Sequence, residues 1–287
     1  MPKLIDSHAH INFQAFASDH DGVIERSLSD DVWLINVGTQ FETSRRAVEM
    51  AESYSDGVYA AVGLHPIHLF EHHVDEEETS FNAAGEEFNA DSYKELVLRS
   101  TKVVAIGEFG LDYYRMPPGE DAERVKKVQR EVVKQHLMLA EYLDKPVNVH
   151  CRDLPASDLS RRRWQAGAYD ELFELLEEFR GQGNIHSFTG TWEQAEKFLN
   201  RGLFIGLNGI ITFDKTGRSE EVVKNLPLER IVLETDAPYL TPIPHRGKRN
   251  EPAFTKFVAQ KIAEIKEIDV EEVEEQTTKN ARELFRI

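Results

Sequence analysis

The chain has 287 residues, of which 40% are apolar and 30% are charged, and its net charge is −17 at pH 7. These values are ordinary for a globular protein that buries a substantial core, and no apolar run approaches the roughly 20 residues of a membrane span. The excess of acid opposes a broad, nonspecific hold on nucleic acid, which usually rests on a basic surface. It does not exclude a compact site where metal ions neutralise a few phosphates.

The chain carries a single cysteine, Cys151, so no internal disulfide can form. Its first residues show no signal-peptide pattern. We therefore expect a cytoplasmic protein without a membrane partner. Nothing in the sequence specifies an oligomer, and a monomer is compatible with it.

Short apolar segments recur along the chain, and most are apolar almost throughout rather than alternating. This pattern is typical of parallel strands that are covered on both faces. The eight segments are 3–10, 32–39, 58–66, 102–110, 146–153, 183–190, 202–209 and 230–238.

Helix-like stretches separate these segments. The ranges 41–54 and 121–143 carry apolar residues at helical spacing, and Thr191 with Gln194 forms a capping-box pattern before a third helix. Eight alternating units of this kind predict an α/β fold, a single (β/α)8 TIM barrel over residues 1–287. The ranges 250–268 and 269–285 predict helices that pack outside the barrel after the last strand.

Two stretches look like insertions at the carboxyl ends of strands. The acidic stretch 75–90 follows the third strand, and 153–170 follows the fifth. Within the first, residues 75–87 are expected to form a solvated surface loop or helix. Loops at these strand ends form the catalytic face of a TIM barrel. The run Arg161–Trp164 could line a groove for a nucleic-acid strand, although an exposed helix face is the favoured interpretation.

Most of the predicted strands end in a potential metal ligand, and these ends should converge at one mouth of the barrel. His8 and His10 share a strand face because side chains two residues apart point the same way. Four imidazoles and two carboxylates exceed the ligands of one ion and suit two ions that share a carboxylate. The six residues are His8, His10, Glu108, His150, His186 and Asp236.

Each of these residues also has a structural explanation when taken alone. Glu108 could pair with a base, His150 and His186 could be buried histidines, and Asp236 could cap the turn before Pro238. It is their joint occurrence at separate strand ends that favours a metal centre. His65 also ends a strand, but it precedes a proline that turn geometry could require, and we expect it to contact substrate.

The sequence resembles the TatD-family metal-dependent deoxyribonucleases, a branch of the amidohydrolase-like barrels, from the first strand to the last helix. The matching stretches are DSHAH, VGLHP, GEFGLDYY, QREVVKQHLMLA, VNVHCRD, HSFTG, ETDAPYLTPIPHRGKRNEP and TTKNARELF. The segment 153–170 is longer than the family's usual run, which leaves substrate specificity open.

The resemblance implies which residues hold each ion. One ion takes His8, His10 and Asp236, the other takes His150 and His186, and Glu108 bridges them. The implied reaction is phosphodiester hydrolysis, in the manner of a 3′–5′ exonuclease that trims DNA, or RNA, from an end. Asp236 and Glu108 are the catalytic candidates, since Asp236 could ligate an ion and also accept a proton from water.

Several cationic side chains could grip phosphate oxygens beside His65. They are Arg152, Arg246, Lys248 and Arg249. The last three lie in one short basic stretch that could equally be a solvated loop.

The sequence leaves the metal and the substrate open. Histidine-rich ligands favour Zn or Mn, whereas the family is usually described as activated by Mg or Mn. The alternative function is a metal-dependent amide or ester hydrolase, for example an aminoacyl-tRNA deacylase, because one barrel and ligand set can serve several substrates. An inactive scaffold is a third alternative, but it would not need all six ligands.

Overall fold

The computed structural model describes residues 1–70, 78, 85–117, 119–153 and 167–287. Most of the two predicted insertions, including Arg161–Trp164, lies outside these residues. Among the helices that are described, none combines the length and apolar character needed to cross a membrane.

All eight predicted strands are present and form one sheet in chain order, with every neighbouring pair parallel. The strands are β1 Leu4–Ala9, β2 Val32–Val37, β3 Val58–Val62, β4 Val103–Asp112, β5 Val147–Arg152, β6 Gly183–His186, β7 Phe204–Leu207 and β8 Ile231–Leu233. A parallel bridge between Ala9 and Ala237 links β1 to the segment after β8. The prediction of a (β/α)8 barrel is therefore confirmed.

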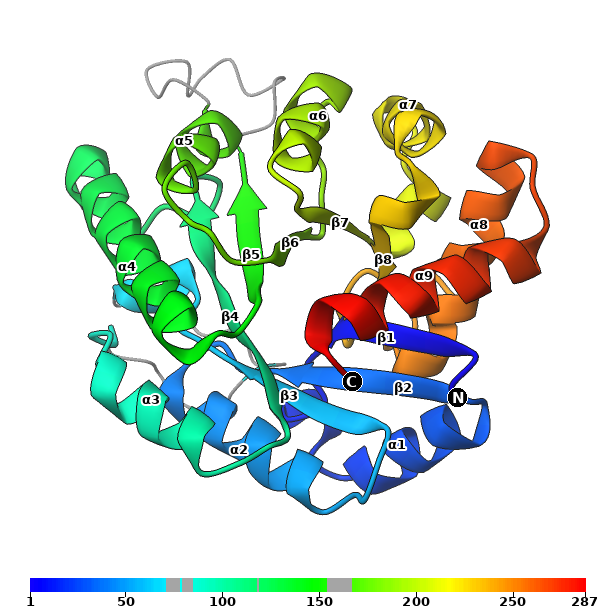
Figure 1. Cartoon of the computed structure of the whole chain (residues 1–287), viewed down its shortest axis with the longest axis horizontal. Coiled ribbons are helices and arrows are strands. Elements are labelled where there is room, and N and C mark those ends of the chain that lie inside the picture. The colour runs from blue at the N-terminus through cyan, green and yellow to red at the C-terminus, as the bar shows by residue number, and fades with distance from the viewer. Residues whose placement is uncertain (71–77, 79–84, 118, 154–166) are drawn as a thin grey trace.

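Helices surround the strands (Figure 1). They are α1 His20–Ser29, α2 Phe41–Glu52, α3 Ala90–Leu98, α4 Ala122–Leu143, α5 Ala168–Leu175, α6 Trp192–Asn200, α7 Arg218–Asn225, α8 Thr255–Lys266 and α9 Val270–Phe285. Short 3-10 turns supplement them at η1 Gln14–Phe16, η2 Pro66–Leu69, η4 Gly209–Thr212, η5 Leu228–Arg230 and η6 Pro252–Phe254. The predicted capping box is present at the start of α6, where Thr191 and Gln194 satisfy each other's backbone amides.

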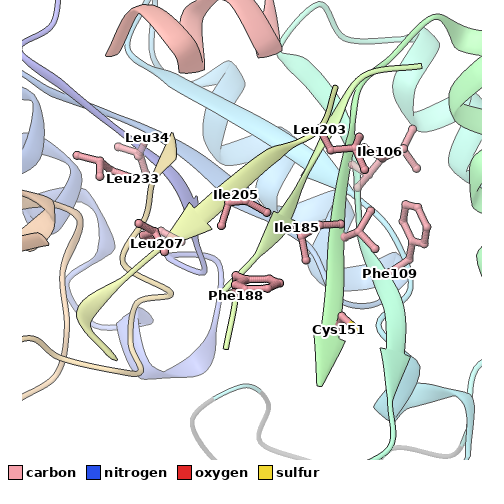
Figure 2. Close-up of a cluster of buried hydrophobic side chains, with 14 of the residues drawn as sticks. Leu34, Ile106, Phe109, Cys151, Ile185, Phe188, Leu203, Ile205, Leu207 and Leu233 are labelled. Atoms are coloured by element: carbon pink, nitrogen blue, oxygen red, sulfur yellow. The ribbon is translucent and has the colours of Figure 1, made fainter. Parts of the chain in front are cut away.

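Apolar side chains fill the space between the strands and the outer helices. In β5, Val147, Val149 and Cys151 belong to this layer, so the residues between them, Asn148 and His150, face the barrel interior. Figure 2 shows part of the layer, with apolar side chains such as Ile185 and Ile205 on neighbouring strands. The alternation explains how one strand can serve both the core and the mouth of the barrel.

A second apolar cluster joins residues of the strands to the end of α9. Ile5, Ile35 and Val232 of the strands pack with Leu284 and Phe285 of α9. Asn280 of α9 donates to the carbonyl groups of Leu228 and Ile231, both at 2.8 Å. The predicted C-terminal helices therefore pack against the strands, and α9 joins the last strand to the first.

This packing predicts that α9 contributes strongly to stability. Phe285 is 2% exposed, and its replacement by alanine should lower the free energy of unfolding by about 3–5 kcal/mol, as for other buried aromatic residues. Denaturant unfolding measures the loss. Met138→Ala is the control, because Met138 is 70% exposed and should change stability by about 0.5 kcal/mol or less. An equal effect of both variants would contradict this role of α9.

Candidate metal centre

The six predicted ligands converge where the strands end. His8, Glu108, His150 and His186 lie within β1, β4, β5 and β6, and His10 and Asp236 follow β1 and β8. Register explains the meeting, since His150 lies opposite His186 in the paired strands β5 and β6. Groups of three from these six residues offer ligand atoms within 4.8 Å of one another.

Glu108 lies at the centre of the cluster, and its two oxygens face different histidines. Oε2 is 3.4 Å from Nε2 of His8 and 3.8 Å from Nε2 of His10. Oε1 is 2.8 Å from Nδ1 of His150 and 3.6 Å from Nε2 of His186. This is the arrangement that a carboxylate shared by two cations requires.

Asp236 closes the cluster on the side of β8. Its Oδ1 lies 3.4 Å from Nε2 of His10, 3.9 Å from Nε2 of His8 and 3.8 Å from Nε2 of His186. The backbone amide of Asp236 donates to the carbonyl of His8 at 2.9 Å, so the contact that closes the barrel also positions this carboxylate. Its φ of 58° is a left-handed conformation, which aspartate tolerates better than most residues.

The ring nitrogens of His8 and His10 show that this pair fits a cation. Nδ1 of His8 lies 3.0 Å from Oδ1 of Asn148, and Nδ1 of His10 lies 2.9 Å from the carbonyl of Val37. Because these partners only accept hydrogen bonds, each neutral ring keeps its proton on Nδ1. The two Nε2 lone pairs then face each other at 3.1 Å beside two carboxylates, and a cation would relieve their repulsion.

The rings of His150 and His186 are also positioned by groups that contact the ring nitrogen facing away from Glu108. Nε2 of His150 lies 3.2 Å from Oδ2 of Asp112, which leaves Nδ1 to face Glu108. Among the described residues, buried Nδ1 of His150 has no partner in hydrogen-bond geometry, as expected for a metal-ligating nitrogen. Nδ1 of His186 lies 3.1 Å from Oε1 of Glu234, a contact at ion-pair distance whose angle lies outside hydrogen-bond geometry. This contact leaves Nε2 of His186 for the cluster.

His65 differs from the four other histidines of the cluster. Its Nδ1 accepts a hydrogen bond from the amide of Ile67 at 3.1 Å, so the proton of the neutral ring lies on Nε2. That N–H faces Oε1 of Glu108 at 3.4 Å. His65 therefore presents a donor to the centre, which suits a substrate oxygen better than a metal ion. The residue also caps η2, so turn geometry and a substrate contact both apply to it.

A structural histidine supports this position from the core. Nε2 of His136 accepts from the amide of Leu64 at 3.1 Å, and its Nδ1 lies 2.8 Å from the carbonyl of Val132. Its ring stacks between Phe88 and Phe109. Burial lowers the pKa of His136 to about 3, so the ring stays neutral and fixes the backbone next to His65.

The two central carboxylates are anionic. Burial favours the neutral acid of Glu108, but the surrounding histidines, His65 and His8 foremost, hold its pKa well below the usual range. Burial likewise acts on Asp236, and its pKa is nevertheless lowered, chiefly by His186. Burial lowers the pKa of His65 well below its usual value, so this ring is neutral.

A cavity of about 1340 Å³ opens over the cluster. Its lining includes His10, His65, Glu108, His186 and Asp236 together with cationic residues. These are Arg115, Arg152, Arg218, Arg246, Lys248 and Arg249, which include every predicted phosphate contact.

The predicted phosphate contacts differ in how the protein holds them. The guanidinium of Arg152 lies 4.2 Å from the centre of the Tyr114 ring, and that of Arg246 lies 3.9 Å from the Phe213 ring. Arg249 forms two hydrogen bonds with Asp19, at 2.9 and 2.6 Å, and one with Glu251. A phosphate contact by Arg249 would compete with these partners and stays a prediction.

The structure adds residues that the sequence did not identify. Asn148, Asp112 and Glu234 hold the histidines from behind, and Arg115 and Arg218 join the cavity lining. Glu234 had a usable signal, since it precedes Asp236 by two positions at the end of a strand. Asp112 had one as well, in the stretch that contains Glu108.

The prediction that the acidic segment is solvated is wrong at Glu78. It is 3% exposed and lines the cavity. Its Oε1 lies 2.7 Å from Nε2 of His68 and accepts a hydrogen bond from Thr39. A buried histidine and hydroxyl draw this carboxylate inward, which the acidic composition of the stretch does not show.

Comparison with known proteins identifies the family. Residues 5–286 match the family described as TatD related DNase. The chain belongs to this family. The TatD resemblance of the sequence is thereby confirmed.

The relatives and a solved structure agree over the full length. The chain is 37% identical to the uncharacterized metal-dependent hydrolase YabD of Bacillus subtilis, with 99% of both chains covered. It is 33% identical to the similarly described YcfH of Escherichia coli, over 99% of this chain and 96% of YcfH. The crystal structure of YjjV, a TatD homologue from Escherichia coli, superposes with a TM-score of 0.80 at 28% identity, covering 99% of this chain and 98% of that one.

The central position of Glu108 predicts the outcome of removing its charge. Glu108→Gln keeps the shape of the side chain but removes the charge that both ion positions would share, so bound metal should fall from two ions to one or none. Elemental analysis after dialysis against Mn²⁺ measures the content. Glu264→Gln, at an exposed carboxylate on α8, is the control and should retain the parent content. Two tightly bound ions in Glu108→Gln would show that Glu108 is not the bridge.

Proposed function

We propose that the protein hydrolyses phosphodiester bonds at the ends of nucleic acid, with two divalent ions held on either side of Glu108. The observation that carries the proposal is the division of the histidines between the two oxygens of Glu108. His8, His10 and Asp236 would hold one ion, and His150 and His186 the other. The cationic cavity above them supports a phosphate-bearing substrate in a chain that is otherwise strongly acidic.

A pair of divalent ions supplies Lewis acidity that offsets the charge of a phosphodiester and makes water more acidic near neutral pH. The protein contributes the groups that move and hold protons. Asp236 is anionic, lines the cavity and can accept the proton of the attacking water on a carboxylate oxygen. His65 stays neutral and can donate a hydrogen bond from its Nε2–H to a nonbridging phosphate oxygen.

Cationic residues at the cavity rim would place the strand. Arg152 and Arg246 each lie over an aromatic ring, which fixes the guanidinium plane. Nη1 of Arg246 donates to the carbonyl of Thr241 at 2.9 Å, so a phosphate would bind to the remaining N–H groups of this guanidinium. Lys248 also lines the cavity and adds a flexible charge. The cavity volume of about 1340 Å³ exceeds the 300–1,000 Å³ that is typical of small-molecule pockets, which supports a polymer end as the occupant.

The finer assignment rests on the family resemblance. The resemblance is the basis for proposing DNA, with RNA as a further substrate, and the 3′–5′ direction of cleavage. None of the cavity contacts described above distinguishes these choices. The ligand set favours Zn²⁺ or Mn²⁺, since Mg²⁺ prefers oxygen ligands. A metal-dependent amide or ester hydrolase would use the same centre, so substrate choice must be measured directly.

The proposal predicts metal-dependent shortening of DNA from one end. Protein stripped of metal and reloaded with Mn²⁺, Zn²⁺ or Mg²⁺ should degrade single-stranded DNA labelled at its 5′ end into a ladder of shortened, labelled products. Asp236→Asn should lower the rate by at least about 100-fold, since it removes the proton acceptor. Aminoacyl-tRNA and a dipeptide serve as competing substrates in parallel. Faster turnover of either one, with intact DNA, would assign the protein to the alternative class.

The proposed role of His65 predicts that its removal lowers catalytic efficiency without changing metal content. His65→Ala removes a donor to substrate but no ligand, so metal content should stay at the parent value while kcat/KM falls by about 10- to 100-fold, the value of a lost hydrogen bond to a charged group. Elemental analysis and steady-state kinetics on the same preparation test both parts. Loss of one ion in His65→Ala would instead make His65 a ligand.

A further inference from the structure

The partners behind the four ligand histidines differ in charge. His8 and His10 are held by neutral acceptors, the amide oxygen of Asn148 and the carbonyl of Val37. His150 and His186 are held by the carboxylates of Asp112 and Glu234. The pair with charged partners is the pair that faces Oε1 of Glu108.

Asp112 is fixed by the turn that follows β4. It is 1% exposed, and its Oδ1 accepts from the amides of Tyr114 at 2.9 Å and Arg115 at 2.7 Å. Its other oxygen therefore remains directed at Nε2 of His150. Hydrogen bonds from the two backbone amides also favour the anionic form of Asp112.

Glu234 is fixed by one backbone amide and by close packing. The carboxylate is fully buried, and Oε1 accepts from the amide of Ser187 at 2.5 Å. Oε2 has no hydrogen-bond partner among the described residues and rests against Gly206, where an added Cβ would lie 2.5 Å from it. The glycine makes room for an acid that serves no apolar packing, which indicates a role directed at His186.

Charge balance explains why the second pair needs these acids. The His8–His10 position has a second carboxylate, Asp236, in addition to its share of Glu108. Asp236 lies nearest His10, with Oδ1 3.4 Å from its Nε2, and is 3.8 Å from Nε2 of His186. The His150–His186 position therefore relies mainly on its share of Glu108 and has the weaker claim on Asp236. A carboxylate that contacts the far nitrogen of a histidine ring raises the basicity of the ligating nitrogen. It also adds negative charge to the position from the other side of the ring.

We propose that the two ion positions are unequal, and that Asp112 and Glu234 are positioning residues for the His150–His186 position alone. The inference rests on the two-ion arrangement of the proposed function. It makes that position dependent on two acids that touch neither ion, whereas the His8–His10–Asp236 position depends on the neutral Asn148. The substrate identity does not enter the inference.

Calorimetric titration of the metal-free full chain with Mn²⁺ tests the inequality. The parent should bind two ions, and His150→Ala and His10→Ala assign each binding step to its position. Asp112→Asn and Glu234→Gln, which preserve shape, should each weaken the His150 step by about 10- to 100-fold and leave the His10 step unchanged. Asn148→Ala is the matched control and should give the opposite pattern.

The outcomes separate this inference from the proposal on which it rests. Binding of a single ion by the parent would overturn the two-ion arrangement and this inference with it. Two ions in the parent, with equal weakening of both steps or no weakening in Asp112→Asn and Glu234→Gln, would overturn the inequality alone. Circular dichroism of the metal-free variants checks folding, and Asp112→Asn decides by itself if Glu234→Gln does not fold.

Discussion

The buried carboxylate of Glu108 is the constraint on which the rest of the site depends. A carboxylate that is 3% exposed is costly to keep ionised unless cations or donors surround it. Five histidines approach its two oxygens. The group that contacts the far nitrogen of each ring determines whether the nitrogen facing Glu108 carries a lone pair or an N–H. The result is a set of acceptors that is complete only with positive charge at its centre.

The barrel makes this arrangement possible through its register and closure. Parallel strands in chain order bring residues from 8 to 236 to the same mouth. The amide of Asp236 hydrogen-bonds to the carbonyl of His8, so the seam between first and last strands is also where one ligand carboxylate is fixed. The helix α9 contacts both sides of that seam, through Asn280 to the carbonyls of Leu228 and Ile231 and through Thr278 to the carbonyl of Lys3. The same two strands therefore carry contacts for stability and contacts for site geometry.

Much of this could be predicted from the sequence, because near-continuous apolar segments specify buried parallel strands and most of them end in a potential metal ligand. The positions of Asp112 and Glu234 beside predicted ligands were a signal, but position alone does not show whether a carboxylate contacts a histidine ring or faces water. The burial of Glu78 was not predicted, because composition describes the average character of a segment. Whether one residue of the segment is buried depends on a buried partner such as His68. The segment 154–166, with Arg161–Trp164, lies outside the described residues and its role stays a prediction.

Anomalous diffraction from crystals of the protein loaded with Mn²⁺ tests the central claim most directly. The proposed arrangement predicts two peaks about 3.5–4 Å apart, one on each side of Glu108, which is the separation found in the two-ion sites of known enzymes. One peak should lie among His8, His10 and Asp236, and the other between His150 and His186. A single peak, or a pair that does not share Glu108, would contradict the account.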